Sequence, residues 1–236
     1  MTIKAVLFDL DGTLLPMEQE IFTKSYFKGL SAAVCPLGYE PKSLIDAIWQ
    51  GTGAMIKNDG IAKNEEVFWK AFSAIFGERV YSDLKHFDNF YKTGFDKIKG
   101  AVGFSENAKR IIELVKSLSL TPILATNPIF PRTAQEKRAK WAGVEPNDFA
   151  YITTYENSSY CKPNPKYYEE ILSITGFKPE ECLMVGNDTS DDLPAETIGI
   201  KTFILTDCLI NKNNIDLSSV PHGGFSELEE FIKEHS

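Results

Sequence analysis

Short apolar runs alternate with segments of helical periodicity over much of this chain. Four such runs are each followed by polar or turn-forming residues, and they cover residues 4–10, 121–126, 182–186 and 201–205. A weaker run covers residues 149–153. Helical spacing of apolar positions marks four further segments: 105–118, 131–142, 165–175 and 191–198. Strands that alternate with helices need crossover connections, so the pattern predicts an α/β fold built on a doubly wound, mostly parallel sheet.

Residues 16–98 depart from this alternation. They contain no clear strand pattern, and helical patterns cover residues 18–30, 41–49, 64–76 and 82–90. Gly51, Gly53 and Gly60 predict a mobile loop within the segment. Of the chain's 28 aromatic residues, 14 lie here, enough for an apolar core. We therefore expect two domains, an α/β core of residues 1–15 and 99–236 and an inserted helical domain of residues 16–98.

Composition and charge narrow the class of protein. The chain has 236 residues, a net charge of −8 and a hydrophobic share of 43%, which is typical of a soluble globular protein. No basic run is present to neutralise a phosphate backbone, so we expect no nucleic-acid partner. No leader-like segment and no long apolar stretch is found, which predicts a cytoplasmic protein without a membrane partner. Four cysteines without metal-ligand spacing are expected to be reduced thiols.

Polar side chains lie at the ends of four of the predicted elements. Asp9 and Asp11 lie where the first run ends, and their spacing of two places both carboxylates on one side of an extended backbone. Thr126 and Asn127 end the second run and offer a hydroxyl and an amide to an oxyanion. Lys162 precedes the helix predicted from residue 165. Three carboxylates at residues 188–192 follow the third run and indicate a hard cation. The carboxyl ends of parallel strands share one edge, so these groups are expected to converge.

The order of these groups resembles the haloacid dehalogenase superfamily of phosphotransferases. Asp9 to Thr13, Thr126, Lys162 and residues 188–192 match its four motifs in sequence order. The helical insertion directly after the first motif resembles the family's type 1 cap. The resemblance covers the whole chain and implies a Rossmann-like core with an inserted helical cap domain. Residues 14–16 and 97–103 are the expected hinges for closure of this cap.

The resemblance also implies a role for each motif residue. Asp9 attacks phosphorus and forms an aspartyl phosphate, and Asp11 acts as general acid and then as general base. Lys162 and Thr126 clamp the phosphate oxygens, and Asn127 adds a hydrogen bond to the phosphate. Mg²⁺ is expected at the Asp9 carboxylate, the Asp11 backbone carbonyl and Asp188.

Two adjacent acids in the last motif are distinguished by spacing. Neighbours on a helix face different ways, so only one of Asp191 and Asp192 is expected to point into the site. The spacing favours Asp192 as the carboxylate that positions Lys162 or a metal-bound water. Asp191 is then expected to cap the helix that follows.

These observations favour a Mg²⁺-dependent hydrolase of a small phosphomonoester, monomeric or weakly dimeric. A sugar phosphomutase of the β-phosphoglucomutase type and a non-enzymatic protein that binds a phosphorylated ligand remain alternatives. Dehalogenases of the same superfamily need neither an acid two residues after the nucleophile nor a metal site, so Asp11 and Asp188 argue against dehalogenation. A phosphonate hydrolase needs a Schiff-base lysine, for which the cap offers Lys24 and Lys28. A phospho-receiver needs an acceptor Asp after its third strand, where the run at residues 149–153 supplies none. The substrate is left open because the cap, which has no fixed motif, contacts the leaving group.

Overall fold

The computed structural model describes residues 2–236, in which five parallel strands form one sheet of order β2-β1-β3-β4-β5. The strands are β1 (Ala5–Phe8), β2 (Thr121–Leu124), β3 (Cys182–Gly186), β4 (Lys201–Leu205) and β5 (His222–Gly223). Strand β1 pairs with β2 on one side and with β3 on the other. The order in which successive strands are added to the sheet thus reverses at β1. A doubly wound fold forms its crevice at such a point. The predicted parallel α/β fold is confirmed.

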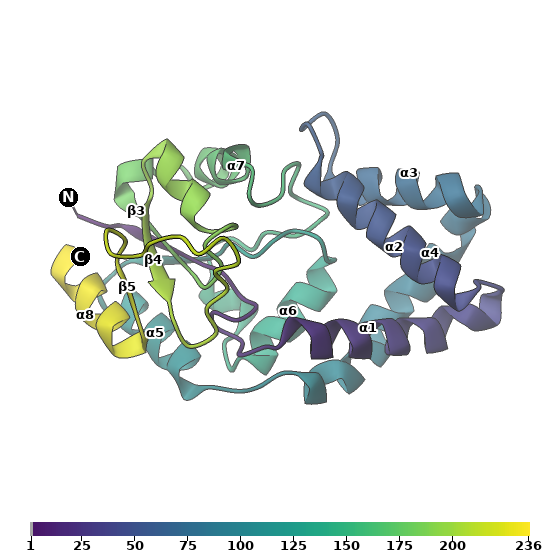
Figure 1. Cartoon of the computed structure of the whole chain (residues 1–236), viewed down its shortest axis with the longest axis horizontal. Coiled ribbons are helices and arrows are strands. Elements are labelled where there is room, and N and C mark those ends of the chain that lie inside the picture. Colours follow the sequence, from purple (N-terminus) through teal and green to yellow (C-terminus); the bar gives the residue numbers. More distant parts are fainter. Residues whose placement is uncertain (1) are drawn as a thin grey trace.

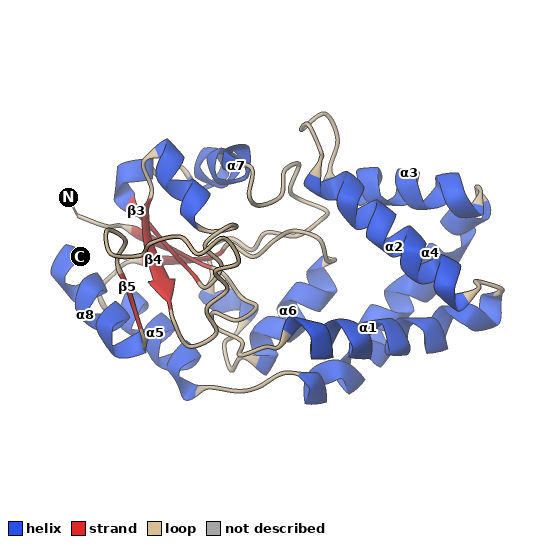
Figure 2. Ribbon diagram, in the orientation of Figure 1, coloured by secondary structure: helices blue, strands red, loops and turns tan. Residues whose placement is uncertain are grey.

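Alternate side chains of β1, β2 and β3 enter two different apolar clusters. Val6 and Phe8 pack with α5 (Glu106–Ser117), α6 (Arg132–Trp141) and α8 (Phe225–His235). Ala5 and Leu7 pack on the other face with α7 (Pro165–Thr175) and the 3₁₀ helix η6 (Leu193–Ile198). Figure 2 shows helices on both sides of the strands. Both faces are covered, as an all-parallel sheet requires.

The regular elements of the inserted segment are all helices, and the segment lies beyond the carboxyl end of the strands (Figure 1). Its elements are α1 (Gln19–Val34), η1 (Cys35–Leu37), α2 (Pro41–Ile56), α3 (Asn64–Phe76), α4 (Arg79–Asn89), the π-helix η2 (Phe90–Gly94) and η3 (Phe95–Ala101). Three rings of α3 form a packing surface inside the insertion, since Phe72 packs against Phe68 and Phe76. In Figure 1 helix α6 lies between the sheet and α1.

The insertion and the α/β part share one continuous apolar cluster. Phe95 of η3 stacks on Trp141 of α6 with ring centroids 5.0 Å apart. The two connecting segments also pair with each other, because Met17 and Val102 form an antiparallel bridge. The division into two domains at residues 15 and 99, and the hinges, remain predictions.

Several local predictions need correction. Helix α2 runs through Gly51 and Gly53 to Ile56 rather than ending at Trp49 in a loop. A Cβ on Gly51 would lie 2.5 Å from the Phe68 ring, so the glycine allows α2 and α3 to approach closely. Residues 149–153 form no strand but one isolated bridge, between Ile152 and Leu124.

The end of the chain holds two elements that the sequence analysis missed, β5 and α8. Helix α8 buries Phe225, Leu228 and Ile232, an amphipathic spacing that is visible in the sequence. Within residues 2–236, no helix combines the length and apolarity needed to cross a bilayer.

Candidate active site

Asp9 and Asp11 follow β1 directly, and each carboxylate contacts a different cation. Oδ1 of Asp9 accepts a hydrogen bond from Nζ of Lys162 at 2.9 Å. Oδ2 of Asp11 accepts from the guanidinium of Arg138. The Thr13 hydroxyl lies 3.2 Å from Oδ2 of Asp9. Two neighbouring acids are thereby placed in unlike surroundings, which is how paired carboxylates acquire different chemical roles.

Lys162 is buried and bridges two carboxylates. Its Nζ lies 2.9 Å from Asp9 and 2.7 Å from Oδ1 of Asp192. Burial alone would lower the pKa of Lys162, but the attraction of Asp192 and Asp9 outweighs it and holds that pKa well above its ordinary value. Lys162 is therefore a permanent cation, held between two acids at the edge of the sheet.

Asp192, and not Asp191, faces Lys162. Oδ2 of Asp192 also accepts a hydrogen bond from the backbone N–H of Asp188 at 3.0 Å. Burial, opposed by Lys162 and reinforced by Asp9, raises the pKa of Asp192 to about 7. One ammonium group cannot neutralise two buried carboxylates, and this explains why the pKa values of Lys162 and Asp192 both lie above their ordinary values.

The prediction that the Asp191 side chain caps the helix after it is wrong. The residue before the first turn of η6 is Asp192, and no side chain caps that turn. Asp191 instead accepts a hydrogen bond through Oδ2 from Nδ2 of Asn127 at 3.4 Å. The 3₁₀ helix starts at Leu193, two residues later than the predicted helix, so Asp191 lies in the loop that faces Asn127.

Thr126 and Asn127 lie where β2 ends, beside the other groups. The Thr126 carbonyl accepts hydrogen bonds from the hydroxyls of Thr153 at 2.6 Å and Tyr167 at 3.0 Å. Oδ1 of Asn127 is buried and has no partner within residues 2–236. The loop after β2 is thus anchored by its backbone.

Arg138 is the main site residue that the sequence analysis did not single out. It is fully buried on α6, and its guanidinium lies over the Phe130 ring, 4.5 Å from the centroid. It also donates to Oε1 of Gln135. Burial raises the pKa of Asp11, Arg138 lowers it, and Asp9 raises it again, with a net rise. The signal in the sequence is positional, because Arg138 lies four residues after the buried Ala134 on one helix face.

A second missed contact ties the first and last motifs together. The Thr13 hydroxyl lies 3.1 Å from Oδ1 of Asn187, and Nδ2 of Asn187 donates to the Cys208 carbonyl at 2.7 Å. Asn187 thus joins the loop after β1 to the segment after β4.

The oxygen donors at this edge suit a hard divalent cation. Five carboxylates gather here, of Asp9, Asp11, Asp188, Asp191 and Asp192, whereas the buried cations among residues 2–236 are Lys162 and Arg138. Oδ1 of Asp11 is buried and finds no hydrogen-bond partner among residues 2–236. In the described part of the chain no three His, Cys, Asp or Glu side chains form a ready ligand cluster. The arrangement fits Mg²⁺, which takes one or two carboxylates and keeps several waters.

A cavity of about 260 Å³ opens beside Asp11, between the helical insertion and the loop after β2. Aromatic and aliphatic side chains dominate its lining. The lining residues are Asp11, Met17, Gln19, Phe22, Thr23, Tyr26, Phe27, Leu30, Ile48, Trp49, Thr52, Phe68, Trp69, Phe87, Tyr91, Ile129, Phe130, Pro131 and Tyr155. Lys24 and Lys28, the lysines that the cap could offer to a phosphonate hydrolase, are not among them.

Comparisons with known proteins show the family and the fold of this chain. The family model of the haloacid dehalogenase-like hydrolases matches residues 3–196. Pyrophosphatase PpaX of Halalkalibacterium halodurans is 27% identical over 206 residues, which is 87% of this chain and 84% of that protein. A crystal structure described as a predicted phosphoglycolate phosphatase from Haemophilus somnus covers 98% of both chains at 18% identity, with a TM-score of 0.60. The 2-haloacid dehalogenase of Pseudomonas syringae covers 100% of both chains at 18% identity, with a TM-score of 0.64. The match to the family extends over most of the chain, and the protein belongs to the haloacid dehalogenase-like hydrolases.

Proposed function

We propose that this hydrolase is a Mg²⁺-dependent phosphatase that cleaves a small phosphomonoester through an aspartyl phosphate on Asp9. One observation carries the proposal: Asp9 contacts Lys162 while Asp11, two residues away, is held by Arg138. A nucleophile beside a buried cation and a separate acid with a raised pKa are the two groups that this chemistry requires. Phosphatase activity in a relative such as PpaX supports the same reading.

In the first step, an oxygen of Asp9 forms a bond to phosphorus as the bond from phosphorus to the ester oxygen breaks. Asp11 gives its proton to that ester oxygen, which leaves as an alcohol. Arg138 occupies Oδ2 of Asp11, and Oδ1 has no partner in the described part of the chain, so Oδ1 is the oxygen available to carry the proton. Lys162 attracts the negatively charged phosphate oxygens, and Thr126 and Asn127 donate hydrogen bonds to them.

In the second step, Asp11 is ionised and accepts a proton from a water molecule. That water attacks phosphorus, the bond between Asp9 and phosphorus breaks, and inorganic phosphate leaves. Arg138 stabilises the ionised form of Asp11 in this half of the reaction. Asp192 holds Lys162 in place in both steps, through the contact at 2.7 Å.

Asp9, Asp188 and the backbone carbonyl of Asp11 are the groups that would hold Mg²⁺. When bound, this ion supplies positive charge that offsets repulsion between the phosphate and the carboxylates. Burial raises the pKa of Asp191, the charge of Lys162 lowers it, and the carboxylates of Asp188 and Asp9 raise it further, with a net rise. Carboxylates this close to one another favour a bound cation.

Reduced thiols support a cytoplasmic setting, since all four cysteines are free. We further propose a small phosphate ester as the partner, on the grounds of a cavity that is closed in by side chains beside Asp11.

The test is release of inorganic phosphate from a panel of phosphomonoesters, with Mg²⁺ and with EDTA. We expect release with Mg²⁺, almost none with EDTA, and none from Asp9→Asn. Halide release from 2-haloacids, or isomerisation of a sugar phosphate without net phosphate release, would contradict the proposal. Asp46→Asn is the matched control, because Asp46 is exposed on α2, away from the site.

A further inference from the structure

The cavity beside Asp11 has an unusual distribution of charge for a site that faces a phosphate. Of the 19 residues that line it within the described part of the chain, Asp11 is the one with a charged side chain. The other polar groups are uncharged hydroxyls, an amide and two indoles. Tyr26 and Tyr91 join their hydroxyls at 2.8 Å, and burial raises the pKa of Tyr26 to about 12, so both remain neutral.

The nearest buried cation is already engaged. Arg138 contacts Asp11 and Gln135, and Phe130 covers its guanidinium. A neighbouring hollow shares Tyr91, Pro131 and Tyr155 with the cavity. Its charged lining residues are Glu65, Asp88, Lys92 and Glu156, and burial together with Glu156 and Asp88 raises the pKa of Glu65. A second anionic group on a substrate would thus lose its hydration and meet carboxylates in return.

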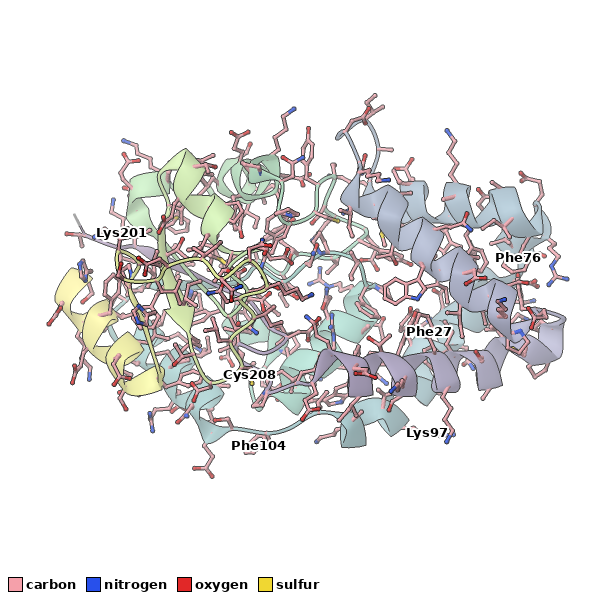
Figure 3. All side chains as sticks on the ribbon, viewed as in Figure 1. Phe27, Phe76, Lys97, Phe104, Lys201 and Cys208 are labelled. Carbon is pink, nitrogen blue, oxygen red and sulfur yellow. The ribbon has the colours of Figure 1, made fainter. Side chains whose placement is uncertain are left out.

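The walls of the cavity are suited to a ring or a branched apolar group. Tyr26 meets Phe130 edge to face with centroids 5.3 Å apart. Phe27 meets Trp49 in the same manner at 5.5 Å, and Figure 3 places Phe27 in the space between α1 and α2. Such rings bind a flat apolar group through contact area and through edge-to-face packing.

We propose that this cavity binds the leaving group of the substrate, and that the substrate is a phosphomonoester of an uncharged, largely apolar alcohol of about the size of one ring. The inference rests on the proposed phosphatase function and names its substrate class. It sets this chain apart from the pyrophosphate implied by the name of its relative and from phosphoglycolate, because both have an anionic leaving group.

The experiment compares benzyl phosphate with ethyl phosphate and 2-phosphoglycolate. All three release a primary alcohol, so differences in leaving-group chemistry are small and binding decides the order. We expect kcat/KM for benzyl phosphate to exceed the value for phosphoglycolate by about a hundredfold, the scale of a few kcal/mol of differential binding. An equal or higher kcat/KM for phosphoglycolate would overturn the proposal.

Two substitutions locate the effect in the cavity. Trp49 lines it but is 53% exposed, so Trp49→Ala should fold. We expect a fall of about tenfold in kcat/KM for benzyl phosphate and little change for ethyl phosphate. Thr52→Lys adds a cation to the wall and should improve phosphoglycolate relative to benzyl phosphate. Ile56→Ala is the control, since Ile56 is exposed on the same helix and does not line the cavity. An equal loss for benzyl and ethyl phosphate in Trp49→Ala would contradict a leaving-group site.

Binding separates failure of this inference from failure of the proposed function. In Asp9→Asn, which removes the nucleophile, calorimetry measures the Kd of benzyl phosphate and of phosphoglycolate. If the wild-type chain releases no phosphate from any ester, the proposed function fails, and the two Kd values still decide the cavity. Tighter binding of benzyl phosphate supports the site, and equal or reversed affinities overturn it.

Discussion

The guanidinium of Arg138 forms an ion pair with Oδ2 of Asp11, across 127 positions of sequence. Arg138 is fully buried, whereas the Asp11 side chain keeps 27% of its exposure at the cavity. The pair therefore connects the apolar cluster under α6 to the groups that follow β1. It also occupies one of the two oxygens of the residue proposed as general acid and base.

Removal of this cation should destabilise the fold. Arg138→Met leaves the Asp11 carboxylate without its partner, and loss of one member of a buried pair costs about 3 kcal/mol of unfolding free energy at a partly exposed site. Urea unfolding of Arg138→Met, Asp11→Asn and the double variant gives a double-mutant cycle, which measures the interaction energy between the two side chains. We expect the double variant to be more stable than Arg138→Met alone. Strictly additive effects would show that the two residues do not interact.

Asp9→Asn should abolish turnover without loss of stability. The substitution keeps the volume and removes a carboxylate that crowds Asp192, so the unfolding free energy should stay the same or rise. Phosphate release and urea unfolding are measured together on Asp9→Asn and on Asp46→Asn. Substantial Mg²⁺-dependent turnover in Asp9→Asn would reassign the nucleophile.

Asp11→Asn should separate the two halves of the reaction. With p-nitrophenyl phosphate the leaving group needs no proton, so the first step proceeds while the water of the second step lacks its base. We expect a burst of nitrophenol followed by a slow steady rate, and a phosphoryl group on Asp9 by mass spectrometry. Rapid turnover without a burst would place the acid and base elsewhere.

Gly186→Ala should disrupt the position of Asp192. A Cβ at residue 186 would lie 1.9 Å from Oδ2 of Asp192, so the carboxylate must turn away from Lys162. We expect a loss of about 2–4 kcal/mol in unfolding free energy, on the scale of a broken buried network, and reduced kcat.

Gly53→Ala is the control for Gly186→Ala, because nothing lies within 4 Å of its added Cβ. That change, inside α2, should stabilise the protein by about 0.5–1 kcal/mol. Equal behaviour of the two variants would contradict the packing argument.

The buried thiols should resist alkylation at pH 8. Burial raises the pKa of Cys161 to about 12. The carboxylates of Asp191 and Glu170 also raise it, and the hydrogen bond from Asn64 opposes the rise. Burial and Glu181 raise the pKa of Cys182 to about 12 as well. At pH 8 each would be thiolate in about one molecule in ten thousand. Iodoacetamide should label Cys35 and Cys208 first in the native protein and all four thiols in urea. Early labelling of Cys161 would show that its loop opens readily.

Strands with long, regular apolar runs were predictable because their signal is local. The β3 and β4 strands have the predicted bounds, and the pattern alone places Asp9, Lys162 and Asp188 where strands end or a helix begins. The weaker run at residues 149–153 fails as a strand because it has one bridging partner, and β5 consists of two residues whose pairing with β4 is a tertiary event.

The sequence by itself determined which chemical groups follow the strands, since carboxylates and a lysine at strand ends must share one edge of a parallel sheet. Its spacing favoured Asp192 over Asp191 as the acid that points inward, and in the structure Asp192 is the one that contacts Lys162. It also gave no sign that Arg138 meets Asp11 or that aromatic rings from α1, α2 and the loop after β2 enclose a largely apolar cavity beside Asp11. Those relationships depend on how α6 and the insertion pack against the carboxyl end of the sheet. Packing of this kind brings together residues that are far apart in the sequence, whereas hydrophobic periodicity reports only on residues within one element.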